Sequence, residues 1–291
     1  MNNKSLQAIF ALHVAVFLFG SAGVVGKLFA ASSLLLVFGR TLFAALSLFP
    51  LLLVQRELHF RSVPKAVYLC GILLAIHWLT FFASLKVAPV AYGLMGFASF
   101  PLFVAWLEPW LFKEPRHGRD WIAALAVLAG MAVMVSDTHL DRLTESNALL
   151  GLLLGVASGF SFALLALINR WQGARMAAFT LAFYQNGAAC LSLLPFVLVS
   201  GVLSVVSVAT WWGLALLGVV FTALSHGLFL FGLRHVSTQF ASLLTSLEPV
   251  YGIVLAYFVL NESPSLRVIV GCAMVLLAAS VETYWQSRTS H

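Results

Sequence analysis

Ten apolar stretches follow one another along the chain, each about 20 residues long and separated from the next by a short polar break. Folded as a helix, such a stretch has the length that crosses the hydrocarbon core of a bilayer. With 62% hydrophobic and 9% charged residues, the chain has more apolar surface than a water-soluble fold can bury. We therefore expect an all-α integral membrane protein with ten transmembrane helices, at residues 8–27, 33–54, 66–85, 90–112, 119–136, 148–168, 177–200, 211–233, 238–260 and 266–285.

The two halves of the chain resemble each other. The segment "RTLFAALSLFP" (40–50) matches "QNGAACLSLLP" (185–195). A longer match without gaps joins "FFASLKVAPVAYGLMGFASFPLF" (81–103) to "FLFGLRHVSTQFASLLTSLEPVY" (229–251). Two collinear matches of this kind indicate a duplicated unit of five helices.

The polar link at 136–147 divides the chain into two such units, which we place at 1–137 and 146–291. Because five is an odd number, the second unit must enter the membrane inverted relative to the first. If the amino terminus is cytoplasmic, eleven of the sixteen Lys and Arg residues lie in cytoplasmic segments and four lie in outer ones. The positive-inside rule therefore predicts that both termini are cytoplasmic.

Several short motifs occur within this arrangement. The first helix closes with "FLFGSAGVVGK" (17–27), Arg40 lies early in the second helix, and the fourth and ninth helices contain a P-[LV]-[FY] motif. A glutamate follows these two helices, in "FKEP" (112–115) and "LNES" (260–263). In the order and spacing of these features, the whole chain resembles the EamA-type members of the drug/metabolite transporter superfamily.

This resemblance implies a fold of ten helices in two inverted repeats. Members of that family are mostly exporters of amino acids, other small metabolites or drugs, and the resemblance implies the same activity here. One departure concerns the residue before each terminal glutamate, which is often glycine in the family. Here Lys113 and Asn261 stand at those positions.

Two charged side chains are expected deep inside the membrane. Glu248 lies near the middle of the ninth span, and Arg40 lies about seven residues into the second, about 10 Å deep at a rise of about 1.5 Å per residue. A charged side chain at such depth costs about 2.5–3.5 kcal/mol unless it faces a cavity or a partner. The repeat places Phe100 opposite Glu248 and Gln185 opposite Arg40, so both charges break the internal symmetry.

These charges favour a substrate site at mid-membrane. Pro249 interrupts the helix beside Glu248, and broken helices hold ligands in many transporters. Glu248 is expected to bind a substrate ammonium group or to carry an exchanged proton, and Arg40 to bind a substrate carboxylate. The competing interpretations are a structural ion pair between the two, a protonated Glu248 bonded to a neighbouring helix, and a scaffold role for Arg40.

Further substrate-binding candidates are polar or aromatic residues inside the spans, namely His77, Trp78, Gln185, His226 and Tyr251. The repeat places His226 opposite Trp78, one residue from His77, so the two histidines are expected to flank one cavity from both halves. Imidazole titrates near neutrality, which suits a role in proton coupling. Packing inside the helix bundle is the competing interpretation for each of the five.

Four residues recur in both halves and are interpreted as architecture, namely Pro101, Pro249, Glu114 and Glu262. The prolines are expected to interrupt the hydrogen-bond ladder of the fourth and ninth helices. The glutamates lie in short turns, where we expect them to cap or charge the first turn of the next helix.

A glycine face is expected on the sixth helix. Gly151, Gly155 and Gly159 recur at every fourth position, so one side of this helix carries no side chains there. Such a face permits close approach, and we expect it to contact another helix of the same chain.

We therefore expect a secondary active exporter of small metabolites, most of all amino acids or related zwitterions, that works by alternating access in the cytoplasmic (inner) membrane. Efflux of hydrophobic cations is the alternative within transport, and an integral-membrane enzyme is a remote one. The chain lacks Walker, H-E-x-x-H and G-x-S-x-G motifs, so no catalytic residue, metal or cofactor is expected. The expected partners are a small-molecule substrate, protons and the lipid bilayer, without nucleic acid, and the expected state is a monomer.

Overall fold

A computed structural model describes residues 3–27, 31–59, 62–88, 90–115, 117–136, 146–260 and 263–289. Within these ranges the regular structure is entirely helical, and ten spans are long and apolar enough to cross a membrane. The predicted all-α fold with ten transmembrane helices is confirmed. The helices are α1 (Asn3–Lys27), α2 (Ser33–Gln55), α3 (Lys65–Val87), α4 (Val90–Phe97), α5 (Phe100–Phe112), α6 (Gly118–Val135), α7 (Ser146–Gly173), α8 (Ala178–Ser200), α9 (Val208–Gly218), α10 (Ser225–Leu233), α11 (Thr238–Thr245), α12 (Glu248–Leu260) and α13 (Leu266–Thr289).

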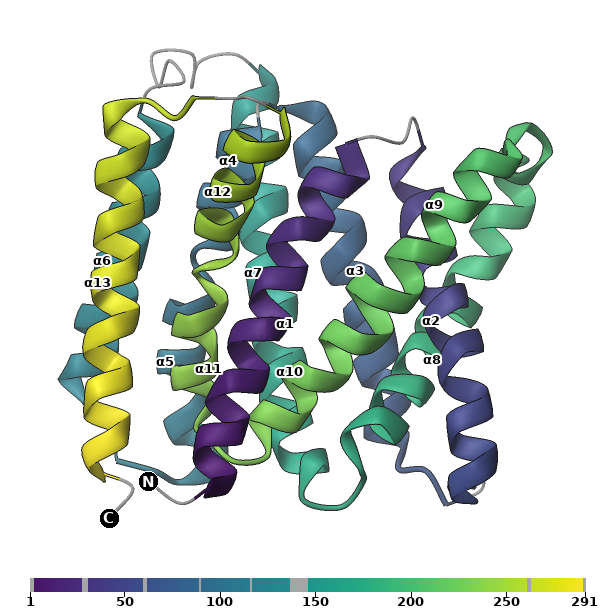
Figure 1. The fold of residues 1–291 in the computed structure, drawn as a ribbon, viewed down its shortest axis with the longest axis horizontal. Coiled ribbons are helices and arrows are strands. Elements are labelled where there is room, and N and C mark those ends of the chain that lie inside the picture. The colour runs from purple at the N-terminus through teal and green to yellow at the C-terminus, as the bar shows by residue number, and fades with distance from the viewer. Residues whose placement is uncertain are drawn as a thin grey trace.

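The helices form a single bundle in which successive spans run in opposite directions (Figure 1). Both chain termini lie at the same end of this bundle, which we call the termini side, and the opposite end is the far side. In the middle, α3 packs along α7 and α8, and α2 packs along α8 and α9. The pair α6 and α13 forms one lateral edge (Figure 1).

Two of the expected spans are broken near their middle. The span at 90–112 consists of α4 and α5, and the span at 238–260 consists of α11 and α12. Pro101 and Pro249 are the second residues of α5 and α12. Proline fits the first turn of a helix, where its missing N–H has no helical partner. As a result Glu248 is the first residue of a half-helix rather than the middle of a continuous one.

The eighth span contains an interruption that the sequence did not predict. Between α9 and α10 the chain forms a π-helix, η3 (Val219–Leu224). The hydroxyl of Thr222 donates to the carbonyl of Leu217, five residues earlier, at 2.8 Å. π-Helical turns are rare and are often found at functional sites.

The glycine face on α7 contacts other parts of the same chain, as predicted, and Gly155 and Gly159 lie against α4. A Cβ at Gly155 would meet the carbonyl oxygen of Gly93 and would lie 3.0 Å from the Cα of Gly96. A Cβ at Gly159 would lie 3.0 Å from the carbonyl oxygen of Phe97. The backbones of α7 and α4 therefore approach closely only because these positions lack side chains.

Glu114, one of the two terminal glutamates, has a partner that the sequence did not predict. Arg170 of α7 donates to the carboxylate of Glu114 at 2.7 Å. The residue that precedes α6, His117, makes no side-chain capping bond. Glu262 lies outside the described residues.

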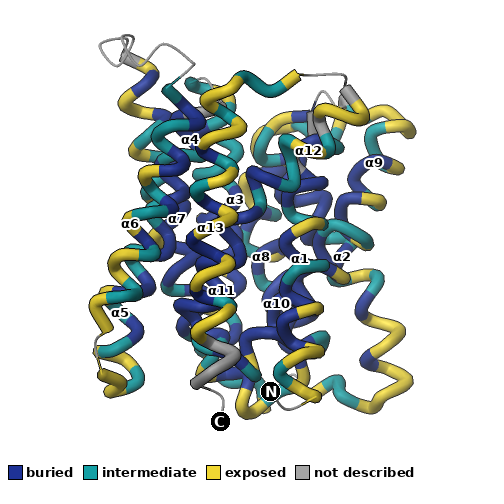
Figure 2. Tube along the Cα trace, turned by 60° about the vertical axis from the view of Figure 1, so that its left-hand side comes forward, coloured by how far each residue is buried: buried dark blue, intermediate teal, exposed yellow. Residues whose placement is uncertain are grey.

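Many of the exposed residues of the bundle are large and apolar; Figure 2 shows how exposed and buried positions are distributed along the helices. Val199, Val54 and Trp212 are 90%, 83% and 75% exposed, which suits contact with lipid rather than with water. Several polar and charged side chains are buried instead, among them Arg40 and Glu108. Charged groups inside a membrane bundle normally face a partner or a cavity rather than lipid.

The α4–α7 contact gives a first prediction. Gly155→Ala should lower the stability of the protein by about 1–3 kcal/mol, because the new methyl group has no room against Gly93 and Gly96. Gly187→Ala is the matched control, since a Cβ at Gly187 meets no atom within 4 Å and alanine favours the helix. Thermal unfolding of the purified protein in detergent measures both. Equal melting temperatures for the two variants would contradict the close contact.

Candidate functional site

A cavity of about 450 Å³ lies inside the bundle, between α1, α2, α3, α4, α7, α10 and α12. Helices from both halves of the chain therefore form its wall. Most of the wall is apolar, and six aromatic side chains contribute to it, namely Phe19, Trp78, Phe81, Phe82, Phe97 and Phe162. The charged or titratable residues of the wall are Arg40, His77, Lys86, His226 and Glu248.

The cavity reaches the far side of the bundle. Its wall includes Val24 near the end of α1, Ala31 just before α2, and Lys86 in the last turn of α3. Lys86 is exposed, and its ammonium group donates to the carbonyl oxygen of Ala31 at 2.9 Å. The cavity is thus accessible from the side opposite the chain termini.

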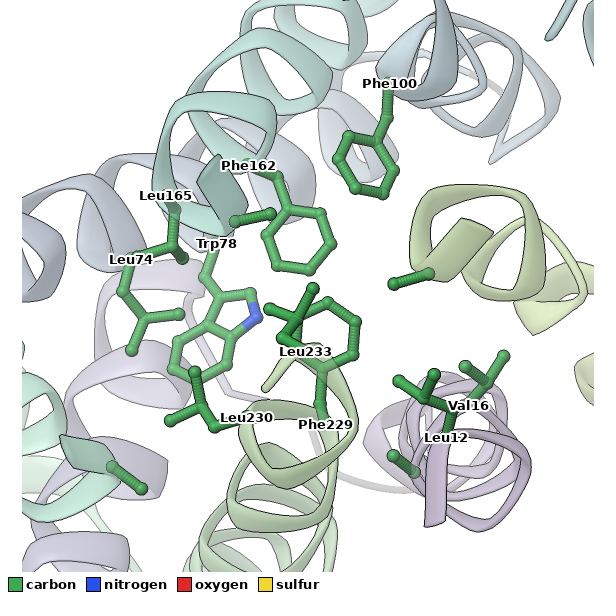
Figure 3. Packing of buried hydrophobic residues seen from close by; sticks show 14 of the residues in the cluster. Leu12, Val16, Leu74, Trp78, Phe100, Phe162, Leu165, Phe229, Leu230 and Leu233 are labelled. Atoms are coloured by element: carbon green, nitrogen blue, oxygen red, sulfur yellow. The ribbon is translucent and has the colours of Figure 1, made fainter. Parts of the chain in front are cut away.

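A layer of packed aromatic side chains, Phe100, Phe162 and Phe229, lies beside the cavity (Figure 3). The ring of Phe162 lies 4.8 Å from that of Phe100 and 5.6 Å from that of Phe229, measured between centroids. Phe100 and Phe229 are each 1% exposed. These ring contacts join α5 and α7 to α10, and Phe162 is also part of the cavity wall.

Glu248 lies in the cavity wall at the amino-terminal end of α12. Its side chain is half-buried, and no described residue donates a hydrogen bond to its carboxylate. The amino-terminal end of a helix carries partial positive charge, which favours a carboxylate at this position. Close packing holds the turn in place, because a Cβ at Gly20 of α1 would meet the carbonyl oxygen of Glu248.

Arg40 of α2 is 4% exposed and reaches into the same cavity. Its Nε donates to the hydroxyl of Thr222 at 2.9 Å and its Nη2 to the carbonyl oxygen of Phe221 at 3.1 Å. Both acceptors belong to the π-helix η3, so this irregular turn binds the buried guanidinium. The guanidinium carbon lies 4.0 Å from the ring centroid of Trp78, a cation–π distance.

Glu248 and Arg40 face one cavity without touching each other. Among the described residues no ion pair within 4.0 Å joins them, although each lies in the electrostatic field of the other. Two of the five N–H donors of Arg40 are used by η3, so three remain for a ligand. The direct structural ion pair that we considered from the sequence is therefore not present.

The two histidines in the wall are held in opposite tautomers. Nδ1 of His77 lies 2.8 Å from the hydroxyl and 3.2 Å from the carbonyl oxygen of Ser158. Because a carbonyl can only accept, the hydrogen-bond partners place a proton on this Nδ1. The amide nitrogen of Asn186 donates to the carbonyl of Ala182 and to Nδ1 of His226, so a neutral His226 carries its proton on Nε2.

Five of the seven predicted substrate-binding residues line the cavity, namely Arg40, His77, Trp78, His226 and Glu248. The other two do not. The side-chain amide of Gln185 donates to Asn169 of α7 at 2.5 Å. The hydroxyl of Tyr251 is bonded to Nδ1 of His13 at 3.0 Å, in the contact between α12 and α1.

One buried acid was not predicted from the sequence. Glu108 of α5 is 5% exposed and lies at the termini side, where Arg170 contacts it. A signal was available, because the tripeptide Leu-Glu-Pro that contains Glu248 also occurs at 107–109. Among the described residues, no three His, Cys, Asp or Glu side chains converge in a way that could hold a metal ion.

Comparison with known proteins extends these observations. Two segments of the chain, residues 6–136 and 149–283, match the EamA-like transporter family. The uncharacterized transporter YwfM of Bacillus subtilis (strain 168) is 27% identical over 285 residues, which cover 95% of this chain and 93% of that protein. An S-adenosylmethionine uptake transporter of Rickettsia bellii (strain RML369-C) is 24% identical over 260 residues, 86% of this chain and 84% of that one.

A solved crystal structure has the same fold. Its TM-score against this chain is 0.80 at 19% sequence identity. The alignment covers 97% of this chain and 98% of the other. At this level of identity the likeness concerns the arrangement of the helices alone.

The direction in which the cavity opens gives a second prediction. In a background with Cys70, Cys190 and Cys272 replaced by alanine, Leu85→Cys should react with a membrane-impermeant thiol reagent applied at the far side, because Leu85 lines the cavity. Leu181→Cys is the control, since Leu181 is 1% exposed and lies outside the cavity wall. Mass spectrometry of protein labelled in oriented vesicles measures the reaction. Equal labelling of the two variants would show that the cavity is closed in the membrane.

Proposed function

Because the chain belongs to the EamA-like transporter family, we propose that this multi-pass membrane transporter exports small zwitterionic metabolites, above all amino acids, by alternating access. The observation that carries the proposal is the pair formed by Glu248 and Arg40. Opposite charges from α12 and α2 face one cavity and do not neutralise each other by contact. Burial of two such charged groups is unfavourable unless a bound ligand supplies hydrogen bonds and opposite charges to them.

A zwitterion fits this pair in a definite way. Its ammonium group would meet the carboxylate of Glu248, which has no donor of its own among the described residues. Its carboxylate would accept hydrogen bonds from the free N–H groups of Arg40. The guanidinium of Arg40 is already held in position by its contacts with η3 and with Trp78. The aromatic wall would receive an apolar side chain, and about 450 Å³ lies within the usual range for small-molecule pockets.

Alternating access is supported by the way the two halves share the cavity. We place the repeat units at 1–137 and 146–291, close to the two segments that match the family separately. Helices α1–α4 come from the first unit, and α7, α10 and α12 come from the second. Rocking of one unit against the other would close the far side and open the termini side around a fixed site.

The orientation and the coupling belong to the same proposal. With both termini in the cytoplasm, as the distribution of Lys and Arg favours, the cavity of this conformation faces outward. Glu248, His77 and His226 would then provide proton-binding groups at the substrate site. A proton that competes with substrate for Glu248 would couple export to the proton gradient.

A second function has a specific observation in its favour. Arg40 already has two hydrogen-bond acceptors and an aromatic partner, which also suits a scaffold residue. In that case Glu248 and the aromatic wall would bind a hydrophobic cation. The S-adenosylmethionine uptake transporter among the relatives is named for a substrate that carries a sulfonium cation as well as an amino-acid group.

The role of Glu248 gives a third prediction. Glu248→Gln should lower the initial rate of amino-acid transport by about 10- to 100-fold, because a charge-assisted hydrogen bond to the substrate is lost. Glu282→Gln is the matched control, since Glu282 is also a buried membrane glutamate but lies on α13, away from the cavity. Radiolabelled substrates in proteoliposomes measure the rate. Equal rates in both variants would remove Glu248 from the transport mechanism.

Replacement of Arg40 distinguishes the two substrate classes. Arg40→Gln should abolish transport of a zwitterionic amino acid but should preserve transport of a lipophilic cation if Arg40 is only scaffold. The solute can also be identified without choosing a test substrate in advance. For this, metabolites are profiled in the medium of cells that overproduce the protein and of cells that overproduce its Glu248→Gln variant. Transport of a lipophilic cation alone would replace the amino-acid proposal by the alternative.

A further inference from the structure

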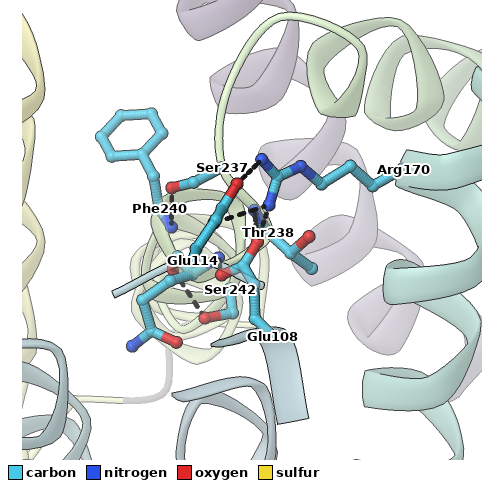
Figure 4. A network of polar contacts seen from close by, with 8 residues as sticks. Glu108, Glu114, Arg170, Ser237, Thr238, Phe240 and Ser242 are labelled. Atoms are coloured by element: carbon cyan, nitrogen blue, oxygen red, sulfur yellow. Dashed lines mark hydrogen bonds and ion pairs between the residues drawn. The ribbon is translucent and has the colours of Figure 1, made fainter. Parts of the chain in front are cut away.

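A network of charged groups joins the end of α5 to α7 and α11 (Figure 4). Arg170 of α7 donates to Glu108 of α5 at 2.5 Å and to Glu114 at 2.7 Å. The guanidinium carbon of Arg170 also lies 4.3 Å from the ring centroid of Phe112. One cation thus joins the end of α5 and the residues after it to α7.

Glu108 has a second set of partners on α11. Its Oε1 accepts the backbone N–H of Thr238 at 2.7 Å, and its Oε2 accepts that of Gln239 at 2.9 Å. Ser237 accepts the N–H of Phe240, so the first three N–H groups of α11 all have partners. The positive end of a helix dipole adds to the attraction for the carboxylate. Glu108 therefore caps a helix that belongs to another span.

These contacts connect the two halves of the chain. Helix α5 belongs to the unit at 1–137, whereas α7 and α11 belong to the unit at 146–291. If the units rock against each other to open the termini side, the bonds from Glu108 to Arg170 and to α11 lie across the moving boundary. Opening must break them, and closing must form them again.

The region next to this network contains buried polar groups without partners. Asn169 and Gln172 of α7 are 1% and 0% exposed, and Gln185 of α8 is 0% exposed. The amide nitrogen of Asn169, the carbonyl oxygen of the Gln185 side chain and both polar atoms of the Gln172 side chain lack a hydrogen-bond partner among the described residues. Unpartnered groups of this kind are unfavourable in a closed bundle. Water would satisfy them in a conformation open to the termini side.

We propose that Glu108 is the latch of an inner gate, and that Asn169, Gln172 and Gln185 form part of the pathway that the gate closes. In the conformation described here, Glu108 holds α5 to Arg170 and to the amino-terminal end of α11, so the termini side is shut. When Glu108 separates from Arg170 and α11, water enters the pathway below Phe162 and hydrates Asn169, Gln172 and Gln185. This proposal rests on alternating access, but it is independent of which solute is carried.

The native Cys70 provides a reporter for the inner pathway. It is fully buried on α3, one turn nearer the termini side than Leu74, which lines the cavity. Residues four apart share a face of a helix, so Cys70 lies directly below the cavity on that face. A protein that keeps Cys70 and has Cys190 and Cys272 replaced by alanine reports inner opening by its rate of alkylation.

A fourth prediction follows. Glu108→Gln should raise the alkylation rate of Cys70 about tenfold, because the charge that binds both Arg170 and α11 is removed. Arg170→Gln should raise the rate less, since the bonds from Glu108 to α11 remain. Glu114→Gln is the control and should change it less than about twofold, because Glu114 is an exposed partner of Arg170 without contact to α11. Quenched alkylation in proteoliposomes, followed by mass spectrometry, measures all three.

A second reporter separates gate opening from unfolding. Leu85→Cys, in a background without native cysteines, reports access to the cavity from the far side. Release of the latch should lower its labelling while that of Cys70 rises, whereas unfolding raises both. If the Glu108→Gln protein unfolds, the same two labelling rates are measured in Arg170→Gln, in which the cap of α11 stays in place. Opposite changes at Cys70 and at residue 85 would then support the latch.

The outcomes are distinguishable from those of the substrate experiment. Opposite changes at Cys70 and at residue 85 support the latch even if no amino acid is transported. Unchanged labelling at both reporters in folded Glu108→Gln and Arg170→Gln proteins would overturn it, even if export is confirmed. An equal effect of Glu114→Gln and Glu108→Gln would also overturn it, because the contact with α11 would then have no role.

Discussion

The free energy of a polar group in hydrocarbon determines how this bundle is arranged. A charge or an unpaired backbone group near the middle of a bilayer is unfavourable by several kcal/mol, on the order of the values measured for insertion of charged residues. The chain accordingly keeps its surface apolar and turns Arg40, His77, His226 and Glu248 toward one interior cavity. The cavity therefore lies where the charged side chains converge.

Interruptions of the helices supply the groups that hold these charges. The π-helix η3 directs a carbonyl and a hydroxyl at Arg40, which two acceptors and Trp78 then fix in place. The break before Pro249 puts Glu248 at the positive end of α12. In a regular α-helix each backbone carbonyl accepts an N–H of the same helix, whereas in η3 the carbonyl of Phe221 also accepts from Arg40. The irregular turns cost little here, because each lies against the interior of the bundle and not against lipid.

The sequence predicted the architecture well and the site in part. Apolar length determined the ten spans, and the cost of burial predicted that Arg40 and Glu248 face a cavity. Gln185 and Tyr251 lie elsewhere, because their partners, Asn169 and His13, come from helices whose rotation the sequence does not give. The π-helix had no signal in the local sequence, since its stabilising partner is Arg40, 182 residues from Thr222. Glu108 could have been predicted, because it lies in a second Leu-Glu-Pro tripeptide identical to the one that contains Glu248.

The two Leu-Glu-Pro carboxylates meet the two half-helices of one broken span in different ways. Glu108 comes from another span, caps α11 and is bound by Arg170, so all of its partners are protein groups. Glu248 begins α12 and has no hydrogen-bond donor among the described residues. Both acids lie at the amino-terminal end of a short helix, where negative charge is favoured. The hydrogen bonds of Glu108 stabilise the closed side of the bundle. The carboxylate of Glu248, which has no such donor, would be free to bind a ligand that enters from the open side. In the proposed cycle, binding of a ligand at Glu248 and release of Glu108 from Arg170 and α11 would link the occupancy of the cavity to the side on which the bundle opens.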